Sequence, residues 1–219
     1  MVLEMQLQSF RISLVLTSFF FPVTSPEIFD SLKAREFEIG RSQANIPTGP
    51  RAYISGPIAR KGDSVIDIDS NRKLVGVSGD SIKDSLQNFS DIINIIKEDF
   101  NVNLDEELDY VELIASYLVI SKRNPFEVLQ NSTEVKFKEK LQEILKTETS
   151  QYRFSLVPKG VLPSSRKWFE ITVSPKLTMP TKAYWVEVIF RDRISHEVIT
   201  FGKNLVSTLS RVINAIEDT

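Results

Sequence analysis

Hydrophobic and polar residues alternate in many short segments of this chain, and a period of two predicts β-strands. At Ser64–Asp69 and Leu74–Ser78 two such runs flank the polar residues Ser70 to Lys73, which predicts a hairpin. The expected strands are 11–21, 37–39, 52–57, 64–69 and 74–78, and then 109–121, 152–157, 168–174, 184–190 and 196–201.

Other segments repeat their apolar residues every three or four positions, which predicts amphipathic helices over 82–97 and 205–217. Pro26 and Pro125 each follow a capping type of residue and mark the starts of two further helices, and another is expected over 133–147. We expect the core to contain Leu14, Leu16, Phe20, Leu86, Phe89, Ile93, Ile96, Leu113, Val119, Val186, Val188, Leu209, Ile213 and Ile216.

The same order of elements occurs twice. With an offset of 99 residues, Leu14, Val15, Thr17 and Pro26 fall on Leu113, Ile114, Ser116 and Pro125. With an offset of 120, FSDIINIIKE (89–98) falls on LSRVINAIED (209–218). This predicts an internal duplication, with a first repeat at 1–104 and a second at 105–219 that together form one continuous unit.

Each half reads strand–helix–four strands–helix, and in this order the chain resembles the TATA-binding protein family. The local likeness is best at SVIDIDSNRKLVGVSGDS (64–81), which runs into the helix at 82–97. The resemblance implies an α+β fold in which two pseudo-symmetric repeats form one curved antiparallel sheet, with helices on its convex face. Tandem strand–helix–strand–strand modules of small-molecule-binding regulators of the gyrase-inhibitor type have similar ingredients and are the alternative.

Strand alternation predicts which side chains face the concave side of such a sheet. That face is expected to carry Ser13, Thr17, Phe19, Phe21, Asp67, Asp69, Glu112, Leu118, Ile120 and Glu187. The family bends DNA at its minor groove with paired Phe wedges and reaches the groove floor with Asn. Here the Asn positions are Ser13 and Glu112, and one wedge position falls on Asp69 or Ser70. Carboxylates there would repel phosphates, so minor-groove bending is not expected.

Composition narrows the possible chemistry. The 219 residues include no Cys and one His, which excludes thiol catalysis and multi-His metal sites. Phosphate-loop, dinucleotide-binding and nucleophile-elbow motifs are also missing, so no enzyme activity, catalytic residue, cofactor or metal is predicted. The net charge is −2, but residues 1–109 hold 11 Lys/Arg and 17 Asp/Glu, whereas the remainder holds 16 and 12.

An apolar strip flanked by acids suits a protein better than a polyphosphate. The leading hypothesis is therefore a non-catalytic, cytoplasmic binding module whose concave face takes a protein or peptide partner or a second copy of the chain, without a membrane contact. The alternative is nucleic-acid binding, of RNA or a single strand, by basic residues at neighbouring hairpin tips: Arg60, Lys61, Arg72, Lys73, Arg166, Lys167, Arg191 and Arg193. A third hypothesis places a small ligand between the halves, against Tyr117, Tyr152, Phe154 and Trp185.

Overall fold

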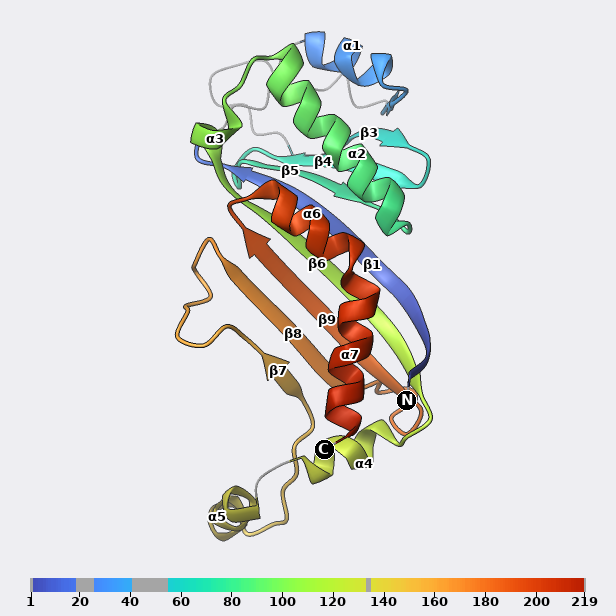
Figure 1. Cartoon of the computed structure of the whole chain (residues 1–219), viewed down its shortest axis with the longest axis vertical. Coiled ribbons are helices and arrows are strands. Elements are labelled where there is room, and N and C mark those ends of the chain that lie inside the picture. Colours follow the sequence, from blue (N-terminus) through green and yellow to red (C-terminus); the bar gives the residue numbers. More distant parts are fainter. Residues whose placement is uncertain (1, 19–25, 41–54, 133–134, 219) are drawn as a thin grey trace.

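A computed structural model describes residues 2–18, 26–40, 55–132 and 135–218. Its strands form one antiparallel sheet of nine, in the order β2-β3-β4-β5-β1-β6-β9-β8-β7 (Figure 1). The strands are β1 (Val2–Leu16), β2 (Glu38–Ile39), β3 (Ser55–Lys61), β4 (Ser64–Asp69), β5 (Leu74–Ser78), β6 (Leu108–Ser121), β7 (Phe154–Leu156), β8 (Trp168–Pro175) and β9 (Ala183–Asp192). The predicted α+β class and antiparallel sheet are confirmed.

The two longest strands, β1 and β6, pair at the centre of the sheet and join the two halves of the chain. β1 begins at Val2, nine residues before the predicted start. The signal for this extension is present, because Met5 and Leu7 alternate with polar neighbours. A register shift between Leu7 and Ser9 interrupts the alternation. Phe19, Phe20 and Phe21 lie outside the described residues.

The helices are α1 (Pro26–Ala34), α2 (Ile82–Asn94), α3 (Leu104–Glu107), α4 (Pro125–Asn131), α5 (Val135–Leu145), α6 (Ser195–Lys203) and α7 (Leu205–Glu217), and a π-helical segment, η2 (Ile95–Asp99), continues α2. Helices α2, α6 and α7 cover the same face of the sheet (Figure 1). The core lies in this layer: Ile12, Leu14, Val75 and Val77 are buried with Phe89 and Ile92. The predicted core residues that the structure describes are buried, except Ile93, which is partly buried.

The prediction of a strand at 196–201 is wrong, because these residues belong to α6. Branched residues such as Val198 and Ile199 favour a strand locally. Tertiary packing decides otherwise. Val198 and Gly202, four positions apart, are both buried, and Phe201 stacks on Phe190 of β9 with ring centroids 4.0 Å apart. A helical stripe therefore covers β6 and β9.

This correction changes the comparison of the two halves. In the first half a strand is followed by a helix, four strands and a helix, as predicted. In the described part of the second half, β6 is followed by two helices, three strands and two helices. The order expected for both halves is thus present in the first only.

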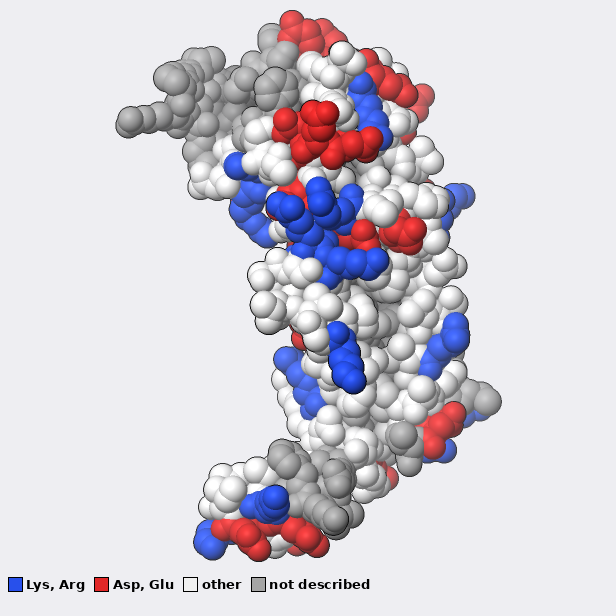
Figure 2. Space-filling view, turned by 60° about the vertical axis from the view of Figure 1, so that its left-hand side comes forward, with Lys and Arg blue, Asp and Glu red and all other residues white. Residues whose placement is uncertain are grey.

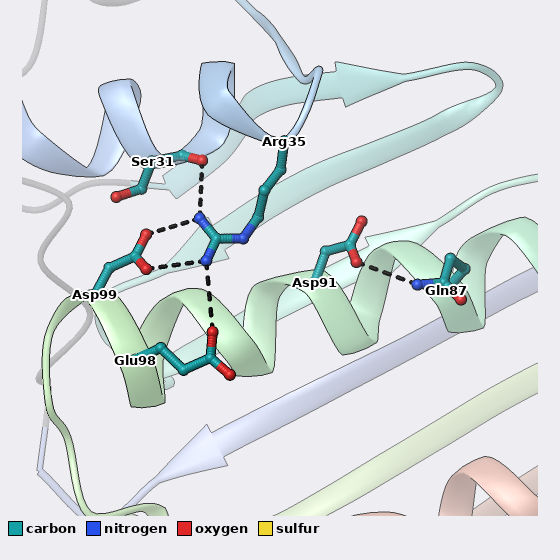
Figure 3. Close-up of polar contacts among 6 residues, drawn as sticks. All are labelled: Ser31, Arg35, Gln87, Asp91, Glu98 and Asp99. Atoms are coloured by element: carbon teal, nitrogen blue, oxygen red, sulfur yellow. Dashed lines mark hydrogen bonds and ion pairs between the residues drawn. The ribbon is translucent and has the colours of Figure 1, made fainter.

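Helix α1 is fastened to the end of η2 by Arg35 (Figure 3). The guanidinium donates to both carboxylate oxygens of Asp99, over 2.7 and 2.9 Å, and to the backbone carbonyl of Ser31. Glu98 lies 3.9 Å from the same group. These hydrogen bonds lower the pKa of the Asp99 carboxyl and raise the pKa of Arg35. Ile28 and Leu32 of α1 are fully buried, so apolar packing holds the helix together with this ion pair.

A search of the described helices for a segment long and apolar enough to cross a membrane found none.

Candidate binding face

The face of the sheet opposite α2, α6 and α7, here called the open face, carries a row of residues that crosses five strands at one level, and four of these residues are polar. Strand pairing places Asp67 beside Gly76, Gly76 beside Ser13, and Ser13 beside Glu112. Glu112 pairs in turn with Arg191. Because directly paired residues point to the same side, this row crosses the middle of the open face. The sequence predicted that Ser13, Asp67 and Glu112 share a face, and the register brings them together.

Arg11 bridges one side of this row. Its Nη2 donates to Asp67 Oδ2 over 2.6 Å, and its Nε donates to Ser13 Oγ over 3.0 Å. To reach Asp67 the guanidinium lies over Gly76: a Cβ placed there would be 2.5 Å from Arg11 Nη2. The absence of a side chain on Gly76 therefore makes room for the ion pair.

Arg191 bridges the other side. Its Nε and Nη2 donate to Glu112 Oε2, over 3.0 and 2.5 Å, and its guanidinium lies 4.4 Å from the ring centroid of Tyr110. Its Nη1 donates to the carbonyls of Pro163 and Ser165, which ties the loop before β8 to the sheet. The sequence predicted that a carboxylate at Glu112 would repel phosphates. Instead Glu112 is 8% exposed and neutralised by Arg191.

The strip beyond this row is apolar. Leu118 and Ile120, both predicted for the face, are partly buried, and Ile114 is 40% exposed. Ile189 and Trp185 of β9 pair with Ile114 and Leu118 and complete the strip. The strip is therefore apolar at two levels, Ile114 with Ile189 and Leu118 with Trp185, and it lies next to ion pairs.

Hydroxyl groups and a weaker ion pair cross the strip. Ser9 and Ser116 share a hydrogen bond of 2.6 Å between their hydroxyls. Next to them the predicted site residue Glu187 lies 3.8 Å from Arg153 Nη2, and both side chains are at least half exposed. Glu187 therefore lies near a cation, as Asp67 and Glu112 do.

Thr17 and Asp69, which were also predicted for this face, form hydrogen bonds that stabilise neighbouring turns and loops. Thr17 donates its backbone N–H and its hydroxyl to the Glu107 carbonyl, and Asp69 accepts the backbone N–H of Arg72 in the β4–β5 turn. The neighbouring Ser18 hydroxyl donates to the carboxylate of Glu107 and lowers its pKa. Phe19 and Phe21, predicted to extend the apolar strip, lie outside the described residues.

The basic residues do not form one surface. The β3–β4 and β4–β5 turns lie at opposite ends of β4, which separates Arg60 and Lys61 from Arg72 and Lys73. The expectation of neighbouring tips is wrong here, because consecutive hairpins of a meander turn at alternate ends. By contrast, Arg166, Lys167, Arg191 and Arg193 lie at the end where β8 begins and β9 ends.

That end of the sheet is at the left of Figure 1, and Figure 2 turns this side forward and shows Lys and Arg gathered in a band beneath acidic side chains. Arg166 forms an ion pair with Asp109, and Lys167 lies 3.4 Å from Asp192. Beside the β3–β4 turn, Lys61 lies 3.2 Å from Asp91. Much of the positive charge predicted for nucleic acid is therefore engaged within the chain.

The residues of the small-ligand hypothesis do not share a cavity. Tyr117 is buried on the helix-covered side of β6, whereas Trp185, the partner of the next residue along β6, points to the open face. Tyr152 donates to the Pro175 carbonyl. Side chains on opposite faces of a sheet cannot line one pocket, so this part of the hypothesis is wrong.

Within the described residues no group of three or more His, Asp or Glu side chains is placed to hold a metal ion. The chain has no significant match among models of protein families, curated proteins or solved structures.

Proposed function

We propose that this chain is a binding module, not an enzyme, and that its open face docks on the open face of a second copy. One observation carries the proposal: the charged residues in the middle of the face neutralise one another, while the strip beside them leaves Ile114 40% exposed. A surface on which exposed hydrocarbon lies beside charges that neutralise one another has the character of a protein interface.

Charge balance favours a protein over a nucleic acid. Phosphate contacts need cations that are free to neutralise them. On the open face Arg11 and Arg191 already serve Asp67 and Glu112, and freeing either would leave a part-buried carboxylate unpaired. Binding of a protein surface without excess charge would leave both ion pairs in place.

Charge balance also favours a second copy. A surface with one sign of charge repels itself, whereas an apolar and balanced surface is complementary to itself. In a two-fold arrangement the strip of Ile114, Leu118 and Ile189 would cover its own equivalent. The polar row would then lie at the rim, where ion pairs tolerate water.

The test is the mass of the particle in solution. Light scattering at up to about 100 µM detects interfaces stronger than about −5 kcal/mol. We expect the wild-type chain to be a dimer, Ile114→Lys to be a monomer, and Ile144→Lys on α5, where the side chain is 73% exposed, to remain a dimer. Because apolar burial drives the contact, changing salt from about 0.05 to 0.5 M should leave it intact.

A monomeric wild-type chain, or equal dimerisation of both variants, would overturn the proposal. So would tight binding of single-stranded RNA or DNA that weakens steeply with salt and that Ile114→Lys does not alter, because that result would favour the nucleic-acid alternative.

We also propose that residues 1–104 and 105–219 are two repeats of one TATA-binding-protein-like unit. The sheet order supports this, because β5 and β4 follow β1 on one side as β9 and β8 follow β6 on the other. Helices α2 and α7, each of 13 residues, close the two halves. An experimental structure in which the halves superpose with β1 on β6, β5 on β9 and α2 on α7 would support the proposal, and halves that superpose only in another strand order would contradict it.

A further inference from the structure

A groove lies on the opposite side of the sheet, between the first turns of α2 and the corner where α6 passes into α7. Its volume is about 640 Å³, within the roughly 300–1,000 Å³ that small-molecule sites occupy. Ile82 and Leu86 form one wall, and Ile199 and Val206 form the other. In Figure 1, α6 ends beside the first turn of α2, and α7 then runs away from it.

Close packing at Gly202 determines where the wall formed by α6 and α7 lies. Gly202 lies against β6 and α2: a Cβ there would be 3.0 Å from Leu113 Cδ1 and 3.3 Å from Leu86 Cδ1. The glycine therefore lets α6 approach the sheet closely, and the chain turns at Asn204 into α7. The space between this corner and the start of α2 remains open, and Val206 beside it is 49% exposed.

The groove combines hydrocarbon with unpaired positive charge. Lys83 stands on the α2 wall and Lys203 on the α6 wall, and both are exposed. Among the described residues neither has an acid within ion-pair distance, unlike Lys61 and Lys167. Lys83 also lies in the first turn of its helix, where the helix dipole disfavours a cation. Asp84 is the acid that lines the groove, so the two lysines leave an excess of positive charge.

We propose that this groove binds a small amphipathic anion, a hydrocarbon chain that ends in a carboxylate, as in a medium-chain fatty acid. The chain would lie on Ile82, Ile199 and Val206, and the carboxylate would lie between Lys83 and Lys203. The α2 wall runs from Ile82 to Ser90, or about 12 Å at 1.5 Å per residue, which sets the length of chain it covers. The site is separate from the open face, and the two proposals stand or fall independently.

The experiment is a titration of the full wild-type chain with sodium decanoate, followed by amide chemical shifts. We expect the shifts to concentrate at the start of α2 and at the α6–α7 corner. Affinity should rise about fourfold for each methylene added from hexanoate to decanoate, because each buried methylene contributes about 0.8 kcal/mol. Decyltrimethylammonium, with the same chain and the opposite charge, should bind at least tenfold more weakly.

Matched variants locate the site. Lys83→Glu combined with Lys203→Glu changes two exposed side chains and should weaken decanoate about tenfold, as should Val206→Asp at an exposed position. Arg211→Glu, exposed on α7 outside the groove, should bind as the wild type does.

Several results would overturn the proposal. They are equal binding of decanoate and decyltrimethylammonium, affinity that does not depend on chain length, and shifts confined to the open face. Binding to phosphatidylglycerol vesicles without binding of free decanoate would favour a membrane surface instead. Binding of an acidic amphipathic peptide without binding of decanoate would favour a protein partner. The chain-length series needs only the wild-type protein, so it decides even if a variant fails to fold.

Discussion

Arg11 and Gly76 occupy neighbouring strands, and the guanidinium of the first lies where a side chain of the second would be. The ion pair between Arg11 and Asp67 passes over this gap, so the glycine and the ion pair depend on each other.

We predict that Gly76→Ala destabilises the wild-type chain by about 1–2 kcal/mol, because Arg11 must move away and leave Asp67 without its partner. In an Arg11→Ala background the same substitution should be neutral or stabilising, since alanine loses less backbone entropy than glycine in a strand. Urea unfolding of the wild type, the two single variants and the double variant measures the cost of Gly76→Ala in both backgrounds. Equal costs in the two backgrounds would show that the guanidinium is not what excludes a side chain.

Arg191 holds Glu112 and the loop before β8 at the same time. Arg191→Ala should cost about 3 kcal/mol, because it leaves a buried carboxylate unpaired. Adding Glu112→Gln should recover part of that loss. The loop should also open, so trypsin should cleave faster at Lys159 and Arg166, as measured by limited proteolysis. Arg153→Ala removes an exposed ion pair of 3.8 Å and is the control, with an expected change below about 0.5 kcal/mol. A cost for Arg191→Ala no larger than that of the control would contradict the assignment.

The Arg35–Asp99 contact predicts a dependence of stability on pH. Hydrogen bonds from Arg35 lower the folded-state pKa of Asp99 below its ordinary value of 3.8. The contribution is therefore present above that ordinary value and is lost as the pH falls through the lowered one. Asp99→Asn should cost about 1 kcal/mol at pH 7 and progressively less as the pH falls from 5 to 2, measured by thermal unfolding. A cost that is the same at every pH would rule out an ionic contribution.

The buried Tyr117 predicts how folding stability changes at alkaline pH. Burial raises the pKa of its hydroxyl to about 12, and the hydroxyl has no hydrogen-bond partner among the described residues. Because the folded pKa is raised, stability is fully present below the ordinary value of 10.0 and declines as the pH rises toward 12. Tyr117→Phe should be neutral or stabilising by up to about 1 kcal/mol at pH 7, and should lose less stability than the wild type above pH 10. A loss of more than 1 kcal/mol at pH 7 would reveal a partner for the hydroxyl.

Local pattern determined much of the fold from the sequence alone. The β4–β5 hairpin has the predicted bounds, Ser64–Asp69 and Leu74–Ser78, because period-two alternation and a polar turn agree there. The closing helix Leu205–Glu217 also has its predicted bounds, because its apolar stripe is regular. Alternation further placed Ser13, Asp67 and Glu112 on one face, since the side-chain period of a strand leaves no other choice once the core face is known.

Tertiary structure decided which charged residues form ion pairs and whether an ambiguous segment folds as a strand or a helix. Whether Glu112 is a free or a paired carboxylate depends on Arg191, 79 residues away, and only strand register brings the two together. The segment 196–201 has the composition of a strand and folds as a helix, because the face of β6 and β9 beneath it accepts Val198 and Gly202 in one stripe. The groove at Lys83 and Lys203 likewise exists only where α2 meets the α6–α7 corner. Sequence period fixes which way a side chain points, whereas long-range packing fixes what it meets.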